Sequence, residues 1–159
     1  MTEPIETTNA TQLSAFAHPM RHRIWREVPP DGITVSQLTH RLATNKGNVA
    51  HHVKVLVAAG LLAPAHTRTV RGGTEQYYVR TARRLRLAGG SRAATRAMFY
   101  SIAEEVEAAP DPMINHRTIR LTRPQADAVA KHLDRVVNEL EPAGEREATY
   151  SVLVSVYRR

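Results

Sequence analysis

The 159-residue chain contains no cysteine, which excludes disulfide bonds, thiolate metal sites and cysteine nucleophiles. No apolar run approaches the roughly 18–20 residues that a membrane-spanning helix needs, so we expect no membrane partner. The first ten residues, MTEPIETTNA, are polar and acidic, which is not the pattern of a secretory signal. Together these absences favour a cytoplasmic protein.

The sequence also lacks the usual marks of an enzyme. It has no glycine-rich phosphate loop, no nucleophile motif and no convincing pair of carboxylates. We therefore expect a protein that catalyses no reaction and needs no cofactor.

Eight histidines raise the question of a metal site. The adjacent pair His51-His52 would point about 100° apart on a helix, so the two rings would not chelate one ion. His18 and His22 have an i, i+4 spacing that suits a metal only when a third ligand joins them. The sequence shows no such third ligand, and we expect no metal.

The positive charge is distributed unevenly along the chain. The net charge is +7, yet residues 11–92 carry 13 Lys and Arg against three acidic residues, a balance of +10. Residues 93–159 have a balance of −1. A basic first half joined to a neutral second half indicates a polyanion-binding module fused to another element.

Helical spacing of apolar residues predicts two helices early in the chain, with Pro19 in the first turn of the second. Pro29-Pro30 ends that second helix. Thr34-Val35-Ser36-Gln37 is a capping box, in which the first and fourth side chains satisfy each other's backbone N–H groups. It opens a short third helix.

Asn45 is a good cap for a fourth helix over residues 46–59, and Gly60 suits its left-handed end. Within this helix His51 points away from an apolar stripe, whereas His52 lies nearer the apolar edge. The stripe consists of Val49, Val53, Leu56 and Val57. Such a helix, apolar inside and polar outside, is suited to a DNA major groove.

Two strands are predicted after the fourth helix, at residues 61–66 and 74–80. The segment between them holds the turn signal Gly72-Gly73 and two basic residues, Arg68 and Arg71. Four helices followed by a hairpin with a basic tip is the layout of a winged helix-turn-helix domain.

These residues also resemble a known family. His18-Pro19-Met20-Arg21 resembles the opening helix of ArsR/SmtB-type winged-helix regulators, and Asn48 to Leu56 followed by Ala59-Gly60-Leu61-Leu62 resembles their recognition helix and its exit. Tyr77-Tyr78 and the basic tip resemble their wing. The resemblance covers about residues 11–82, with Ala50 where the family often has serine. It implies a dimeric bacterial or archaeal transcription factor that binds an operator with pseudo-twofold symmetry.

The candidate DNA contacts fall into two groups. One group lies at the start and on the outer face of the fourth helix, where base edges and phosphates are both within reach. The other lies on the wing, where arginines would neutralise phosphates or enter a minor groove. The candidates are Asn45, Lys46, Asn48, His51, His52, Lys54, Arg68 and Arg71.

The second half begins with a predicted helix over residues 91–108, capped by Ser91. Its broad face of small and medium residues suits a partner helix, and the resemblance implies that this helix makes the dimer. A strand at residues 116–121, a helix opened by the capping box Thr122-Arg123-Pro124-Gln125 and a strand at residues 149–157 follow.

This strand-helix-strand unit has too little core to stand alone. It is either an effector-sensing module, in which Tyr150 or Tyr157 would line a pocket for an unidentified small molecule, or a scaffold for a dimer or tetramer.

We therefore expect a mainly α protein with a small β component (α+β). Its parts are a disordered tail (residues 1–10), a winged helix-turn-helix domain (11–88), a dimerisation helix (89–110) and a strand-helix-strand extension (111–159). The expected function is sequence-specific binding of a double-stranded operator by a homodimer, most simply as a repressor. Two alternatives stay open, namely a non-sequence-specific architectural DNA-binding protein and a protein-interaction adaptor with a winged-helix fold.

Overall fold

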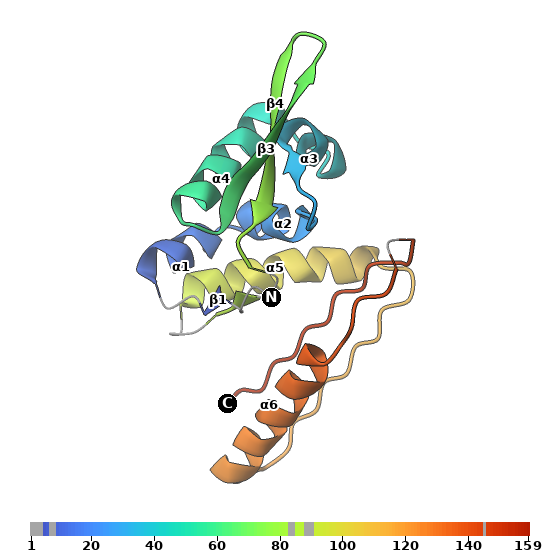
Figure 1. Cartoon of the computed structure of the whole chain (residues 1–159). Coiled ribbons are helices and arrows are strands. Elements are labelled where there is room, and N and C mark those ends of the chain that lie inside the picture. The colour runs from blue at the N-terminus through green and yellow to red at the C-terminus, as the bar shows by residue number, and fades with distance from the viewer. Residues whose placement is uncertain (1–4, 7–8, 83–84, 88–90, 145) are drawn as a thin grey trace. The chain divides into compact units, whose positions relative to one another are not determined.

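The computed structural model describes residues 5–6, 9–82, 85–87, 91–144 and 146–159 (Figure 1). The chain divides into two compact units, Met1–Pro112 and Met113–Arg159, which we describe separately. In chain order the elements are β1 (Ile5–Glu6), α1 (Ala10–Phe16), α2 (Pro19–Glu27), β2 (Ile33–Thr34), α3 (Val35–Arg41), α4 (Lys46–Ala58), β3 (Leu62–Val70), β4 (Gly73–Arg80), β5 (Leu85–Arg86), α5 (Arg92–Ala108) and α6 (Arg123–Asn138).

Side-chain caps fix the starts of the helices, as the sequence predicts. Oγ1 of Thr34 accepts from the backbone N–H of Gln37 at 3.2 Å, while Oε1 of Gln37 accepts from the N–H of Thr34 at 2.9 Å. Oδ1 of Asn45 accepts from the N–H of Asn48 at 2.8 Å and caps α4. Gly60 ends this segment with a φ of +70°, a conformation that costs glycine little.

The core of the first unit lies between α1, α2, α3 and α4. Phe16 and Trp25 meet edge to face, with ring centroids 5.8 Å apart, and the guanidinium of Arg80 lies over the Trp25 ring. Both aromatic residues are buried and belong to the core. The largest fully buried apolar side chains are Phe16, Ile24, Val28, Ile33, Leu38, Val49, Val53, Leu56, Leu61 and Leu62.

The sheet of this unit has the order β2-β4-β3 and is antiparallel. β2 pairs only at the base of the hairpin, where Ile33 lies opposite Tyr78 and Thr34 opposite Tyr77. Beyond that base β3 and β4 extend away from the helices as a two-stranded ribbon, labelled at the top of Figure 1.

The hairpin is longer than the sequence predicts. β3 continues to Val70, four residues past the expected end, because Thr67, Thr69 and Val70 favour a strand and find ladder partners in β4. Only Arg71 and Gly72 form the turn, and the φ of Gly72 is +104°, in the region that favours glycine.

A short strand also forms in the polar tail. Ile5–Glu6 pairs in parallel with Leu85–Arg86, where the sequence predicts a disordered segment. Two residues carry no periodic pattern, and their partner lies about eighty positions along the chain, so nothing local signals the pairing. Residues 1–4 and 7–8 of the expected tail, and the expected domain boundary between 88 and 89, lie outside the described residues.

The predicted helix at residues 91–108 is confirmed as α5, with Ser91 as its cap. Its small side chains Ala94, Ala97 and Ser101 are buried against α1 and α2 of the same chain. Part of the face that the sequence assigns to a partner helix is therefore covered by the chain itself.

In the second unit the helix is confirmed and the two strands are wrong. α6 starts at the predicted capping box of Thr122, but residues 116–121 and 149–157 are not assigned to strands. A strand needs a neighbour that completes its backbone ladder, and composition alone does not supply one. Every described side chain of this unit is exposed or half-buried. Among the described residues, no helix has the length and hydropathy to cross a membrane.

Candidate nucleic-acid interface

Helices α3 and α4 are joined by a tight turn that sets the direction of α4. Ala43 in this turn has a φ of +49°, a left-handed conformation that is uncommon for a residue with a side chain. Asn45 then begins α4, and its side chain is occupied as a cap through Oδ1. Asn45 is exposed, and its Nδ2 amide group is a hydrogen-bond donor that this cap does not use.

One face of α4 is anchored in the core and the opposite face is exposed. Val49, Val53 and Leu56 are buried, which fixes the rotation of the helix. Lys46, His51 and Lys54 are exposed and Asn48 is half-buried, in agreement with the helical spacing. Because α4 contains no acidic residue, its exposed face is uniformly neutral or basic.

The structure does not place His52 with the exposed candidates. Its side chain is only 5% exposed, and its ring centroid lies 4.5 Å from that of His18 and 5.2 Å from that of His51. The 100° step from His51 turns His52 toward α2, so it supports α4 from behind. Burial, with smaller contributions from His18 and Arg21, lowers the pKa of His52 to about 4 and keeps the ring neutral.

His18 and His22 have separate partners. Nδ1 of His18 accepts from the backbone N–H of Met20 at 3.1 Å and caps α2. Nδ1 of His22 lies 2.7 Å from Oγ of Ser101 on α5. Within the described part of the chain, no group of three or more His, Asp or Glu side chains is arranged to hold a metal ion.

α2 is also tied to α5 by ion pairs beside the His22–Ser101 contact. Arg26 pairs with Glu105, and Nη1 of Arg23 lies 3.9 Å from Oε2 of Glu104. Burial, followed by the charge of Arg26, lowers the pKa of His22 to about 4. A neutral His22 is therefore part of the packing that joins these two helices.

The two wing arginines differ in their surroundings. Arg68 lies on β3 directly opposite Glu75, so an acidic residue offsets its charge. Arg71 lies in the turn at the tip, where the ladder places no acidic residue opposite it. Both are exposed, and Arg71 has the less compensated charge.

A cavity of about 330 Å³ lies between α4 and the wing. Lys54 lines it from α4, while Gln76 and Tyr78 line it from β4. Sequence reasoning missed the contribution of β4, although the strand alternation that places Gln76 and Tyr78 on one face was a usable signal. The full lining is Lys54, Val57, Ala58, Pro64, Gln76 and Tyr78.

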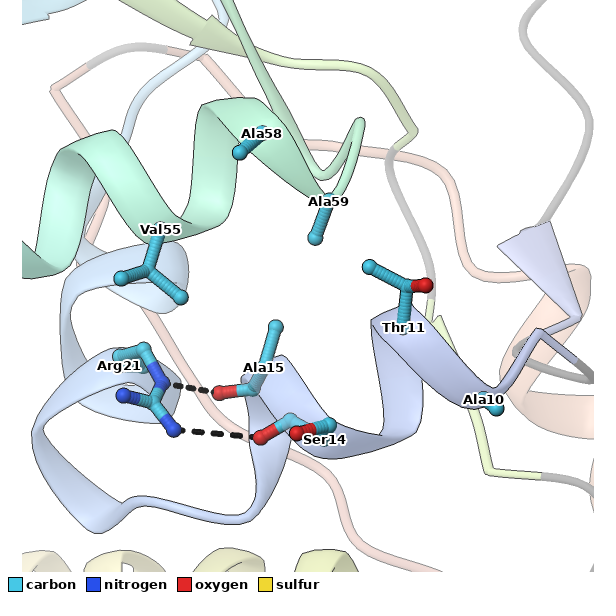
Figure 2. Close-up of a pocket in the computed structure, with 8 residues that line it drawn as sticks. All are labelled: Ala10, Thr11, Ser14, Ala15, Arg21, Val55, Ala58 and Ala59. Carbon is cyan, nitrogen blue, oxygen red and sulfur yellow. Dashed lines mark hydrogen bonds between the residues drawn. The ribbon is translucent and has the colours of Figure 1, made fainter.

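A second, larger cavity of about 610 Å³ lies between α1 and the end of α4 (Figure 2). Arg21 crosses its edge, where its guanidinium donates to the carbonyl oxygens of Ser14, at 3.1 Å, and Ala15. Val55 and Ala58 line the α4 side, so a ligand in this cavity would contact the helix that carries His51. Tyr150 and Tyr157, the residues expected to line an effector pocket, are 85% and 66% exposed.

Comparison with known proteins finds a similarity for the segment that contains α4. A family model described as a helix-turn-helix domain matches residues 16–64, from the end of α1 into β3. No curated protein matches the chain. Among solved structures, the multiple antibiotic-resistance repressor (MarR) from Listeria monocytogenes 4b F2365 is similar at 17% identity, over 82% of this chain and 73% of that one, with a TM-score of 0.28.

The family match is to helix-turn-helix domains in general, so the ArsR/SmtB resemblance stays a prediction. The α+β fold class is confirmed by the helices and the β2-β4-β3 sheet. Residues 16–64 are similar to a helix-turn-helix domain, and with the β3–β4 wing beside them the first unit has a winged helix-turn-helix fold.

Proposed function

We propose that the protein is a homodimeric, sequence-specific DNA-binding regulator that acts as a repressor by occupying its operator. The observation that carries the proposal is the exposed face of α4, where Lys46, His51 and Lys54 lie on a helix without acidic residues, beside a wing tipped by Arg71. Two such helices in a dimer would enter successive major grooves about 34 Å apart. The repressor role is the simplest result of a protein that occupies its operator.

The proposed contacts divide by position on this surface. His51, Asn48 and Lys54 lie along the middle of α4 and would meet base edges in the major groove. Lys46 and Nδ2 of Asn45 at the start of α4 would hold phosphates. Arg71 would neutralise a phosphate or enter the adjacent minor groove.

The proposal is tested by titrating salt while measuring binding to two DNAs of equal length. One is the region upstream of the protein's own gene, and the other is a scrambled version. We expect a preference of about a thousandfold or more for the first DNA, as operator-reading proteins show. Equal binding to both at every salt concentration would instead favour the architectural alternative, in which phosphate contacts supply all the affinity.

Changing Arg71 to alanine is expected to weaken binding to both DNAs alike. Removing one phosphate contact should also reduce the slope of log affinity against log salt by about one. Lys131→Ala, which removes an exposed lysine of α6, is the matched control and should leave the slope unchanged.

If the protein is an adaptor, the Arg68→Ala and Arg71→Ala variants will bind its protein partner as well as the original chain does.

Changing His51 to alanine is expected to reduce the preference for the operator rather than general affinity. A lost base contact costs about 1–3 kcal/mol with the specific DNA and little with scrambled DNA. His132→Ala removes an equally exposed histidine from α6 and serves as the control. An equal loss of affinity for both DNAs would assign His51 to phosphate contact and contradict its role in base reading.

A further inference from the structure

The last extended segment of the chain, residues 149–157, has five central residues whose sequence reads the same in both directions. Its centre is Ser151-Val152-Leu153-Val154-Ser155, with Leu153 in the middle. Neighbouring strands in an antiparallel sheet run in opposite directions, so such a segment is complementary to a second copy of itself. We propose that residues 149–157 of two chains pair as antiparallel strands about a twofold axis through Leu153, and that this pairing joins the two subunits.

The residues that flank the centre fit the same register. With Leu153 opposite Leu153, Glu147 of one copy lies opposite Arg159 of the other, which brings opposite charges together at each end. Tyr150 lies opposite Val156, an aromatic residue facing a β-branched one. A slip by one residue would place Ser155 opposite Val152 and lose these matches.

The structure leaves the required surface uncovered within one chain. Val152, Val154 and Val156 alternate along the segment and are 57%, 39% and 41% exposed. In an extended chain these three side chains share one face. Pairing about Leu153 would set Val152 beside Val154 of the second copy on that same face. The valine faces of the two copies would then form one continuous apolar surface.

α6 offers a second apolar surface in the same unit. Val129, Val136 and Leu140 are exposed on this helix. The apolar face that they form would pack against the sheet made by the paired segments. A second copy of the chain is the occupant that the sequence symmetry specifies, because an unrelated partner would not require a palindrome. The inference deepens the dimer part of the proposed function by naming where the subunits meet, and it does not depend on the DNA contacts.

The absence of cysteine makes the register directly testable in the full-length protein. Leu153→Cys adds one thiol per chain, and the twofold axis places it opposite its own copy. Opposed residues in antiparallel strands have Cα atoms about 4.5–5.5 Å apart, within disulfide range. Mild oxidation should therefore convert most of this variant to a covalent dimer on a non-reducing gel.

Two further variants fix the register. Ser151→Cys alone and Ser155→Cys alone should stay largely monomeric on the gel, because each residue lies opposite the other and not opposite itself. An equimolar mixture of the two, with one carrying a size tag, should give a cross-linked heterodimer. Failure of Leu153→Cys to cross-link, or equally fast cross-linking of either serine variant alone, would overturn the proposed pairing.

A solution measurement guards against an artefact of oxidation. Val154→Asp places a carboxylate on the paired face and should raise the dimer dissociation constant at least tenfold by light scattering. Asn138→Asp, which adds the same charge on the side of α6 opposite Val129, Val136 and Leu140, should leave the dissociation constant nearly unchanged. If Leu153→Cys cross-links but the original protein shows no operator preference, the pairing stands and the proposed function fails. If the original protein prefers the operator but the Leu153→Cys variant does not cross-link, the proposed function stands and the pairing fails.

Discussion

Phe16→Ala is expected to lower the free energy of unfolding by about 3–5 kcal/mol. Phe16 is fully buried, and its ring packs edge to face against Trp25 at 5.8 Å and against His22 at 6.0 Å between centroids. Alanine would leave a cavity at the junction of α1 and α2. It would also remove an aromatic contact worth about 0.5–1.5 kcal/mol beyond the buried area.

Urea denaturation followed by circular dichroism measures this loss. Phe99→Ala is the matched control, because the same side chain is removed from the surface of α5, where Phe99 is 42% exposed. We expect this control to cost less than about 1 kcal/mol. Equal losses in the two variants would contradict the position of Phe16 at the centre of the first unit.

Lowering the pH from 6.5 to about 4 is expected to remove about 3 kcal/mol of stability through His22 alone. Burial is the main reason that the pKa of His22 falls from 6.5 to about 4, and its side chain is only 4% exposed. The unfolded chain takes up this proton near pH 6.5, whereas the folded chain resists it until about pH 4. The contribution is therefore complete above pH 6.5 and decreases as the pH falls, by about 1.4 kcal/mol per unit.

Urea unfolding at a series of pH values tests this expectation. His22→Asn removes the titrating group but keeps an amide that can hydrogen-bond the hydroxyl of Ser101. The decrease in stability between pH 6.5 and 4 should be smaller in this variant by about 3 kcal/mol. His132→Asn, at an exposed position, should keep the full decrease. An unchanged pH dependence in His22→Asn would show that the folded protein accepts a charged His22.

The sequence predicts the helices of this protein well because their ends are local features. Thr34, Asn45, Ser91 and Thr122 each bond to a backbone N–H three residues ahead, and the structure confirms all four caps. A cap needs only a few neighbouring residues, so its signal survives without knowledge of the fold.

Strand pairing depends on residues far away in the chain, and the predictions are weaker there. β3 is four residues longer than expected because its outer half finds partners in β4. Residues 149–157 have strong strand composition, yet one chain does not form a strand there. Composition predicts an extended backbone, while the identity of the neighbour is decided by the rest of the assembly.

In the candidate interface, too, positions set by local spacing are predicted and positions set by distant residues are not. Helical spacing predicts correctly that His51 is exposed opposite the buried valines of α4. His52 needs knowledge of where α2 lies, since the contact with His18 is what buries it. Strand alternation places Gln76 and Tyr78 on one face of β4, whereas their position beside α4 depends on tertiary packing that no local pattern specifies.

The two parts of the proposed DNA surface, α4 and the wing, differ in how rigidly they are held before DNA binds. The rotation of α4 is set by buried valines and leucine, so its exposed side chains lose little freedom on binding. In the described part of the chain the outer hairpin has no third strand, since β2 ends its pairing at Tyr77. Isolated two-stranded ribbons are only marginally stable in water. The conformational entropy lost when the tip becomes ordered on DNA will therefore offset part of the attraction between Arg71 and a phosphate. The freedom of the tip before binding will let the wing adapt to grooves of different width.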